Sequence, residues 1–330
     1  MTQRTPPARP PRPFTRREAL QVTTTLGAGL AVLGAGLWLR RRYDQPHAAP
    51  SLVIRDHRLE RPKGLVELAM AHGPDAAKNV RRALEAMGGM GAFVKNGDKV
   101  VIKPNVGWNR VPEQAANTNP DVVEEVIRQV KAAGASKVWV SDSPVNTAER
   151  CFERSGIKKA TGDANGTLVM PDGNAFREVK VEGQVLKAAD VLWPIVEADK
   201  VINLPLPKHH GLTRATLSMK NWYGVLGGHR VRLHQDLHRS IVDLAMMVKP
   251  TLTILDATRV LMANGPTGGS LADVKRLDMI AVSVDPVAID ALGAELLGLA
   301  PEDVGYIVEA EKAGLGTSKW KTLKYEDVPA

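Results

Sequence analysis

The sequence has 330 residues, a formal net charge of +8 and an aromatic content of only 4%, so an aliphatic core is expected. Eight arginines and two acidic residues fall within residues 1–50, which carry +6 of that charge and leave +2 for the rest. A nucleic-acid-binding protein needs a basic patch on its folded domain, so this distribution argues against nucleic acid as a partner. The single cysteine, Cys151, excludes an internal disulfide and an iron–sulfur cluster held by this chain.

Residues 1–49 have the composition of a targeting segment. A stretch without acidic residues ends in the pair Arg16-Arg17, and an uncharged apolar run follows over 22–39. Residues 15–21 resemble a twin-arginine export motif, although Ala19 stands where a bulky apolar residue is usual. Because about 20 apolar residues can span a bilayer, the segment predicts either a twin-arginine-type signal or a membrane anchor, followed by a linker.

Both alternatives predict the same destination for the rest of the chain. Five arginines precede the apolar run and three follow it, so the N-terminus is expected to stay inside. Residues 50–330 should then be exported across the cytoplasmic membrane and be periplasmic, or anchored and facing outward. The export machinery is the partner that the N-terminal segment predicts.

Helical and strand-like segments alternate after residue 50. Asp75 predicts the N-cap of a helix that runs to about Met87. A short buried strand is expected over 99–102, and apolar residues at helical spacing predict a helix over 121–133. The next strand is expected over 138–140. These segments together have the order of a βαβ unit.

The second half of the chain continues this alternation. A β-hairpin is predicted over 176–187, because apolar and polar residues alternate around Glu182-Gly183. The helix at 287–297 has Asp285 as its N-cap and Pro286 in its first turn. The sequence therefore predicts a single α/β domain over 50–330, with a mainly parallel, doubly wound sheet and an inserted β-hairpin. The remaining predicted elements are strands at 200–204, 251–255 and 279–284, and helices at 237–248 and after Pro301.

Polar residues follow four of the predicted strands. Open parallel sheets bind ligands at the carboxyl ends of their strands, although Asp and Asn at strand ends also simply make turns. Together these residues predict a shared site for a small anionic ligand, in which Asp142, Lys208 and Asp256 are the candidate catalytic residues. The residues at the strand ends are Lys103-Pro104-Asn105, Asp142-Ser143, Lys208-His209-His210 and Asp256.

A second polar motif, Lys220-Asn221, lies beside the aromatic pair Trp222-Tyr223. A lysine charge and an oriented amide can hold a carboxylate or phosphate. The glycine-rich stretch 264–269 has backbone N–H groups for an anion, but no Walker or dinucleotide-binding glycine pattern is present, so nucleotide binding of the standard kinds is unsupported. The predicted ligand-binding residues are Lys103, Asn105, Lys220 and Asn221.

Five of the eight histidines fall within residues 209–238. His234 and His238 are four residues apart at the start of a predicted helix, a spacing at which two imidazoles can hold a metal ion from one face. With His210 they form the predicted ligand set for a divalent metal, whose identity the sequence leaves open. Histidines with a purely structural or solvated role are the alternative.

Five stretches match family motifs in the expected order, namely 101–105, 133–142, 207–213, 216–224 and 283–291. On these motifs, which span about residues 100–295, the chain resembles the bacterial and archaeal proteins grouped as domain of unknown function 362. In the family's Lys-x-His pattern Lys208 and His210 match, whereas His209 stands where a small polar residue is usual. The resemblance implies little about activity. Some relatives carry iron–sulfur modules that one cysteine cannot hold, so electron transfer would need a separate redox partner protein.

Two hypotheses follow for the function. The first is an exported protein that binds a small anionic ligand with a divalent metal. Whether it also acts on the ligand as an enzyme is left open by the sequence. The second is a non-catalytic periplasmic accessory or assembly factor for a redox or metalloenzyme system.

Overall fold

A computed structural model describes residues 52–60, 64–228, 230 and 236–329. The predicted signal or anchor at 1–49 and the predicted metal ligand His234 lie outside these residues. Within the described ranges, no helix is both long enough and apolar enough to cross a membrane.

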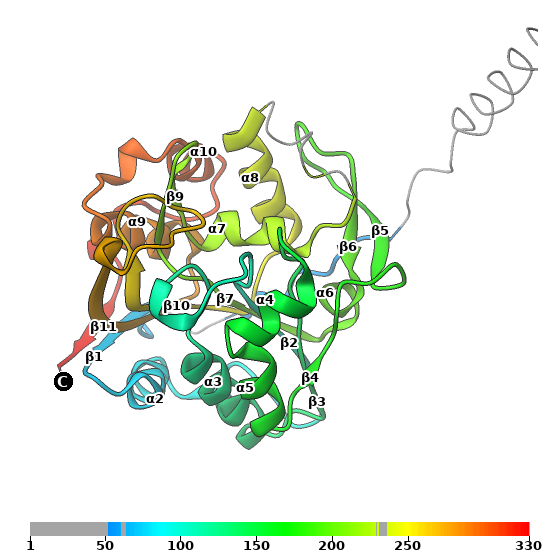
Figure 1. Cartoon of the computed structure of the whole chain (residues 1–330), viewed down its shortest axis with the longest axis horizontal. Coiled ribbons are helices and arrows are strands. Elements are labelled where there is room, and N and C mark those ends of the chain that lie inside the picture. Colours follow the sequence, from blue (N-terminus) through cyan, green and yellow to red (C-terminus); the bar gives the residue numbers. More distant parts are fainter. Residues whose placement is uncertain (1–51, 61–63, 229, 231–235, 330) are drawn as a thin grey trace, which may run out of the picture. The chain divides into compact units, whose positions relative to one another are not determined.

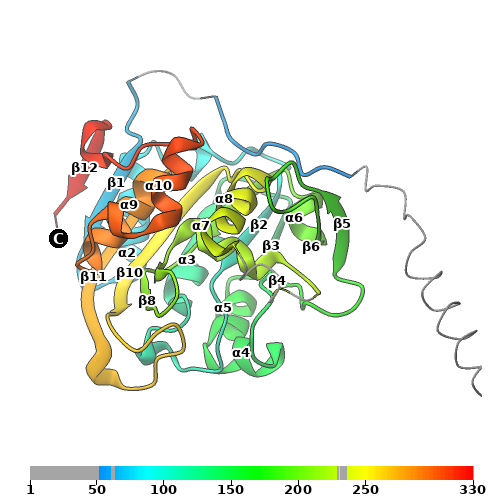
Figure 2. The ribbon, with the colours of Figure 1, turned by 90° about the horizontal axis from the view of Figure 1, so that it is seen from above.

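The central sheet has the strand order β12-β1-β11-β10-β7-β2-β3-β4. Along this path β11 is antiparallel to both of its neighbours, and the other adjacent strands are parallel. Figure 2 shows β12 at one edge and the separate β5–β6 hairpin toward the opposite side. The strands of the path are β1 Leu68–His72, β2 Lys99–Pro104, β3 Lys137–Val140, β4 Thr167–Leu168, β7 Lys200–Leu204, β10 Leu252–Leu261, β11 Val274–Ser283 and β12 Tyr325–Val328.

Helices cover both faces of this sheet, which makes the central strands apolar on both sides. Val101 of β2 packs into one apolar cluster, whereas its neighbours Val100 and Ile102 pack into the other. Figure 1 shows α2, α3 and α5 on one side of β10, β7 and β2, with α8, α9 and α10 on the other. The predicted mainly parallel, doubly wound α/β fold is thereby confirmed. The helices are α2 Ala76–Ala86, α3 Pro120–Ala132, α4 Ala148–Arg154, α5 Ile157–Asp163, α6 Trp193–Glu197, α7 Ser218–Asn221, α8 Leu237–Met247, α9 Pro286–Leu296 and α10 Gly305–Lys312.

Helix caps account for the accurate starts of α2 and α9. The side chain of Asp75 accepts a hydrogen bond from the backbone N–H of Lys78 at 2.9 Å. Asp285 accepts from the N–H groups of Val287 and Ala288, both at 2.8 Å. A carboxylate in this position satisfies backbone donors that have no partner inside the helix.

The inserted hairpin consists of β5 (Phe176–Lys180) and β6 (Ala188–Leu192), which pair antiparallel. It confirms the predicted hairpin, although its second strand begins just after the predicted range ends. The buried carboxylate of Asp243 in α8 accepts three backbone N–H groups of the connecting loop, at 2.7–2.9 Å. A side chain at Gly183 would overlap that carboxylate, so the loop and α8 fit only with glycine there.

Two differences from the predicted elements affect the site. β10 does not end at residue 255 but continues to Leu261, so Asp256 lies inside a strand and not at its carboxyl end. Lys208–His210 forms a short strand, β8, which pairs with β9 (Arg214–Thr216) and touches β10. The polar triplet, predicted to follow the strand at 200–204, is thus held in extended backbone.

Candidate functional site

A cavity of about 850 Å³ lies beyond the carboxyl ends of β2 and β3, bordered by β8 and α7. It gathers residues from segments more than 100 positions apart in the sequence. Parallel strands end at the same edge of a sheet, which explains why these residues meet there. Seven of the ten predicted catalytic, ligand-binding and metal-ligand residues line it: Lys103, Asn105, Asp142, Lys208, His210, Lys220 and Asn221.

A buried ion pair lies at the base of the cavity. Lys103 Nζ is 2.8 Å from Asp142 Oδ1, and the two side chains are 1% and 3% exposed. The other carboxylate oxygen of Asp142 accepts the backbone N–H of Val106 at 2.6 Å, and Oδ1 also accepts that of Ser143 at 3.0 Å. Burial lowers the pKa of Lys103, and the charge of Asp142 opposes this shift. Because a buried charge is tolerated when it is paired and hydrogen-bonded, the Lys103–Asp142 pair needs no ligand to neutralise it.

Two amides connect this pair to a second lysine. Asn221 Oδ1 accepts from Lys103 Nζ at 2.7 Å and from Asn105 Nδ2 at 3.0 Å. Asn105 Oδ1 in turn accepts from Lys208 Nζ at 2.9 Å. The other end of Asn221 donates to Asn203 Oδ1 of β7 at 2.8 Å, which fixes its orientation. Asn203 was not singled out in the sequence, since it lies within an ordinary apolar strand pattern.

Lys208 is buried and has only neutral partners among the described residues. Besides Asn105, its ammonium donates to the carbonyl oxygen of Ala116 at 2.5 Å. Burial lowers the pKa of Lys208 to about 7. The nearby charges of Lys220 and Lys103 lower it further, and that of Asp142 opposes them. Its positive charge therefore has no direct counter-ion within the described residues.

Lys220 lies on α7, is only 8% exposed and lines the cavity. Its Nζ is 4.8 Å from the centre of the Tyr223 ring. None of the residues that the structure describes provides this ammonium with a hydrogen-bond acceptor or a carboxylate within reach. Burial lowers the pKa of Lys220 to about 8. A buried ammonium in this state is costly unless a ligand completes its environment.

The position of α7 depends on a buried carboxylate from another helix. Asp290 of α9 accepts the backbone N–H groups of Ser218 at 2.7 Å and Met219 at 3.0 Å, which begin α7. Burial raises the pKa of Asp290 to about 7, although these hydrogen bonds oppose the shift. The matched stretch 283–291 thus supports the site by positioning Lys220 and Asn221.

Arg230 extends the positive lining of the cavity. Its guanidinium donates to the carbonyl oxygens of Ser143 at 2.7 Å and Pro144 at 2.8 Å. Burial lowers the pKa of Arg230, with Asp142 opposing. No local motif marks Arg230 in the sequence, and its contacts are 86 and 87 residues away. For that reason it was not predicted.

The imidazole of His210 is oriented by backbone groups. Its Nδ1 accepts from the N–H groups of Leu212 at 3.1 Å and Thr213 at 3.3 Å. In a neutral ring this places the proton on Nε2, as inferred from the hydrogen bonds. A protonated Nε2 is compatible with an anion nearby, whereas a metal ion needs an unprotonated nitrogen.

The histidine set predicted for a metal is not assembled within the described residues. His238 packs against α10, with its ring centre 6.2 Å from that of Tyr306. Among the residues described, no group of three or more His, Cys, Asp or Glu side chains could hold a metal ion. Because His234 lies outside them, the metal site stays a prediction.

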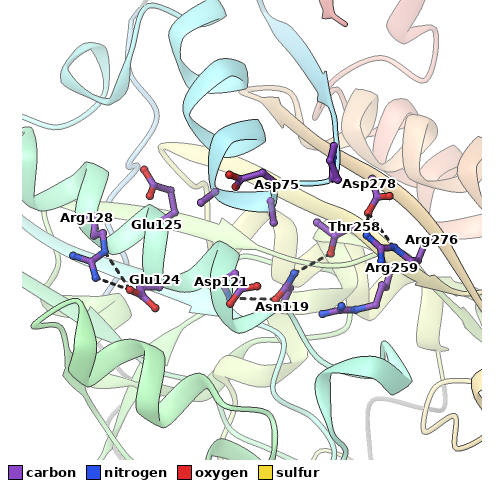
Figure 3. Close-up of a pocket in the computed structure, with 13 residues that line it drawn as sticks. Asp75, Asn119, Asp121, Glu124, Glu125, Arg128, Thr258, Arg259, Arg276 and Asp278 are labelled. Carbon is purple, nitrogen blue, oxygen red and sulfur yellow. Dashed lines mark hydrogen bonds and ion pairs between the residues drawn. The ribbon is translucent and has the colours of Figure 1, made fainter. Parts of the chain in front are cut away.

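Asp256 is not part of the lysine-lined cavity. It accepts the backbone N–H of Asn119 at 2.7 Å and the hydroxyl of Thr258 at 2.6 Å, and burial raises its pKa. Asn119 and Thr258 line a separate pocket of about 360 Å³ (Figure 3). Arginines and carboxylates in that pocket pair with one another, as Arg276 does with Asp278 and Arg128 with Glu124. Asp256 therefore holds the backbone at Asn119, just before α3. Its predicted place in the ligand site is corrected, because β10 continues beyond residue 256 and Asp256 does not lie at the end of a strand.

Three comparisons relate the chain to known proteins. The family described as Domain of unknown function (DUF362) matches residues 100–295. The thylakoid-associated protein sll1697 of Synechocystis sp. is 29% identical over 253 residues, which cover 72% of this chain and 74% of that protein. The lactate racemase apoprotein of Thermoanaerobacterium thermosaccharolyticum superimposes with a TM-score of 0.45 and 14% identity. That match covers 72% of this chain and 58%, less than two thirds, of the racemase chain.

Proposed function

The chain belongs to the DUF362 family, and we propose that the lysine-lined cavity of this member binds a small organic anion. The observation that carries the proposal is Lys220, a buried ammonium that lines the cavity and has no acceptor or counter-ion among the described residues. An anion in the cavity would supply what the protein does not. Charge-assisted hydrogen bonds of this kind are roughly twice as strong as neutral ones.

The charge balance of the cavity supports an anionic ligand. Three lysines and Arg230 line it, and Asp142 is the carboxylate among its described lining residues. Asp142 is fully engaged by Lys103 and two backbone N–H groups. Lys208 and Lys220 have no carboxylate partner among the described lining residues. Two positive charges close together in a buried site are unfavourable until a ligand neutralises them.

The shape and walls of the cavity indicate the size of the ligand. About 850 Å³ lies within the range of small-molecule sites, which is about 300–1,000 Å³. The walls include Trp108, Pro266 and the side chains of Val145 and Leu212, which are 63% and 68% exposed. A carboxylate or phosphate with a short apolar body fits this combination of a cationic base and an apolar rim.

Calorimetric titration of the full chain with pyruvate tests the proposal, with pyruvamide as an uncharged ligand of similar shape and inorganic phosphate as a second anion. We expect pyruvate to bind at least about tenfold more tightly than pyruvamide. The variant Lys220→Met should lose the preference, whereas Lys312→Met, which removes an exposed lysine on α10, should keep it. Equal binding of charged and uncharged ligands, or unchanged anion affinity in Lys220→Met, would contradict the proposal.

Metal binding and export are separate parts of this proposal. Elemental analysis of the protein purified from its native cell fraction, compared with the His210→Ala variant, tests the predicted metal site. Stoichiometric metal in the unchanged protein that is lost in the variant supports metal binding. Cell fractionation tests export, which should fail when Arg16-Arg17 is changed to Lys-Lys. Turnover measurements on a bound anion then separate an enzyme from an accessory protein that only holds the ligand.

A further inference from the structure

We propose that Lys220 forms a Schiff base with a carbonyl group of its ligand, which identifies the ligand class as a 2-oxo acid or a similar carbonyl-bearing anion. This inference rests on the proposed function, because the anionic group holds the carbonyl beside the lysine. It is carried by the contrast between Lys220 and the two other lysines that line the same cavity.

The hydrogen bonds of the three lysines differ. Lys103 Nζ has three partners, namely the carbonyl of Pro104, the amide of Asn221 and the carboxylate of Asp142. Lys208 Nζ has two, Asn105 and Ala116. Lys103 uses all three N–H bonds of its ammonium in these contacts, and Lys208 uses two N–H bonds in its own. Imine formation removes both hydrogens of the attacking amine, so either lysine would have to break hydrogen bonds that the structure shows. They are suited to bind charge and not to react.

Lys220 Nζ has no such contacts within the described part of the chain and faces the cavity from α7. Its Nζ lies over the face of the Tyr223 ring, 4.8 Å from the ring centre. A ring face stabilises the ammonium form of the lysine. After the proton has left, the ring does not hydrogen-bond to the nitrogen, so the lone pair is available. The nitrogen can therefore lose a proton and attack a carbon atom without breaking any described hydrogen bond.

The protonation state agrees with this role. Burial lowers the pKa of Lys220 to about 8. At pH 7.5 roughly a quarter of the side chains would be neutral, compared with roughly 0.1% at the ordinary lysine value. Desolvation in an apolar pocket is an established way to activate a lysine for attack on a carbonyl.

The reaction balances without an oxidant or reductant. The neutral amine of Lys220 attacks the carbonyl carbon, a C–N bond forms, and the carbonyl π electrons move to oxygen. A proton passes from nitrogen to that oxygen, which gives a carbinolamine. The carbinolamine then loses water and leaves a C=N bond, so one amine and one carbonyl become one imine and one water. Lys208 and Arg230 would hold the acid group meanwhile, which raises the effective concentration of the carbonyl.

Reductive trapping of the full chain tests the inference. The protein is incubated with pyruvate and sodium cyanoborohydride, and the adduct is counted by intact mass and located by peptide mapping. We expect a single carboxyethyl group on Lys220, with inorganic phosphate slowing its formation. Propanal, which has a carbonyl but no acid group, should label Lys220 at least about tenfold more slowly at equal concentration.

Two variants sharpen the test. Lys220→Arg keeps the positive charge but cannot form an imine, so it should bind pyruvate and give no adduct; Lys312→Met should label like the unchanged chain. Labelling spread over exposed lysines, or equal labelling in Lys220→Arg, would overturn the inference. Pyruvate binding without any adduct would refute the Schiff base and leave the proposed function standing, whereas no binding at all would refute both. If Lys220→Arg fails to fold, peptide mapping of the unchanged chain decides.

Discussion

The backbone of Gly224 passes directly against the side chain of Asp142. A Cβ atom at position 224 would overlap Asp142 Oδ1 and lie 2.5 Å from Lys103 Nζ. The carbonyl oxygen of Gly224 also accepts the N–H of Ser143 at 2.6 Å, so the two segments cannot move apart freely. The base of the cavity therefore requires glycine at this position.

Gly224→Ala should accordingly disrupt the ion pair. We expect the free energy of unfolding to fall by about 1–3 kcal/mol, the usual cost of overpacking, together with a loss of anion affinity. Urea denaturation and calorimetry measure the two effects. Gly173→Ala is the matched control, because no atom lies within 4 Å of a Cβ at that exposed position. Similar stability of both variants would show that the close approach is not tight.

Lys220→Met should make the protein more stable while abolishing anion binding. The variant removes a buried charge that lacks a counter-ion among the described residues and keeps the apolar stem. We expect thermal or urea unfolding to show a gain of about 1–3 kcal/mol. Lys312→Met, on the surface, should change stability by less than about 0.5 kcal/mol. A clear loss of stability in Lys220→Met would mean that the ammonium is satisfied in the free protein.

Asp142→Asn should have the opposite effect on stability. It leaves the Lys103 ammonium buried without its counter-ion, which typically costs about 3–5 kcal/mol. Combining it with Lys103→Met removes the orphaned charge and should recover part of the loss. A double-mutant cycle in urea measures the coupling. Additive effects of the two substitutions would argue against a strong pair.

Asp256→Ala should lower stability without affecting anion binding. The substitution leaves the buried N–H of Asn119 without its acceptor, at a cost of about 1–3 kcal/mol. Pyruvate affinity should stay within about twofold, because Asp256 does not line the lysine cavity. A large loss of affinity in a folded variant would return Asp256 to the ligand site.

Anion affinity should fall as the pH rises through about 7 and then about 8, the values to which burial lowers the pKa of Lys208 and of Lys220. Lys220 must carry its proton to attract an anion, and its pKa is lowered to about 8 by burial. The other charged groups that face it in the cavity are Lys208, Lys103, Asp142 and Arg230. Because the pKa of Lys220 is lower in the folded than in the unfolded chain, its contribution to stability increases between about pH 8 and the ordinary lysine pKa of 10.5. Anion affinity and the free energy of unfolding, measured from pH 6 to 10 on the unchanged chain and on Lys220→Met, test the predicted fall in affinity and the predicted rise in stability. A pH profile that the substitution leaves unchanged would contradict both predictions.

Local signals explain what the sequence predicted well. Asp75 and Asp285 mark helix starts because a cap acts on its own next few residues. Lys103 and Asp142 could be placed in one site because the rule for parallel strands needs only strand ends. These inferences require no knowledge of distant contacts.

The rest depended on contacts that no local pattern encodes. Asp256 was misplaced because Thr and Ala residues continue β10 beyond the apolar run, so the strand end was set too early. Arg230 and Asn203 contact the site through partners that lie 87 and 18 residues away in the chain. The role of Asp290 in holding α7 is also invisible in a helix pattern, where a buried carboxylate has no expected partner.

The amides of Asn105 and Asn221 give the cavity a fixed polarity. Each amide oxygen already accepts from a lysine ammonium, so rotating either amide would set an N–H group against a positive charge. Neither amide can therefore turn to present an oxygen to an incoming molecule. A ligand meets a surface whose dipoles are set before it arrives, and little reorganisation energy is spent on binding. Selectivity in such a site comes from rejecting hydrogen-bond donors, so amines and amides should be excluded even when they fit by size.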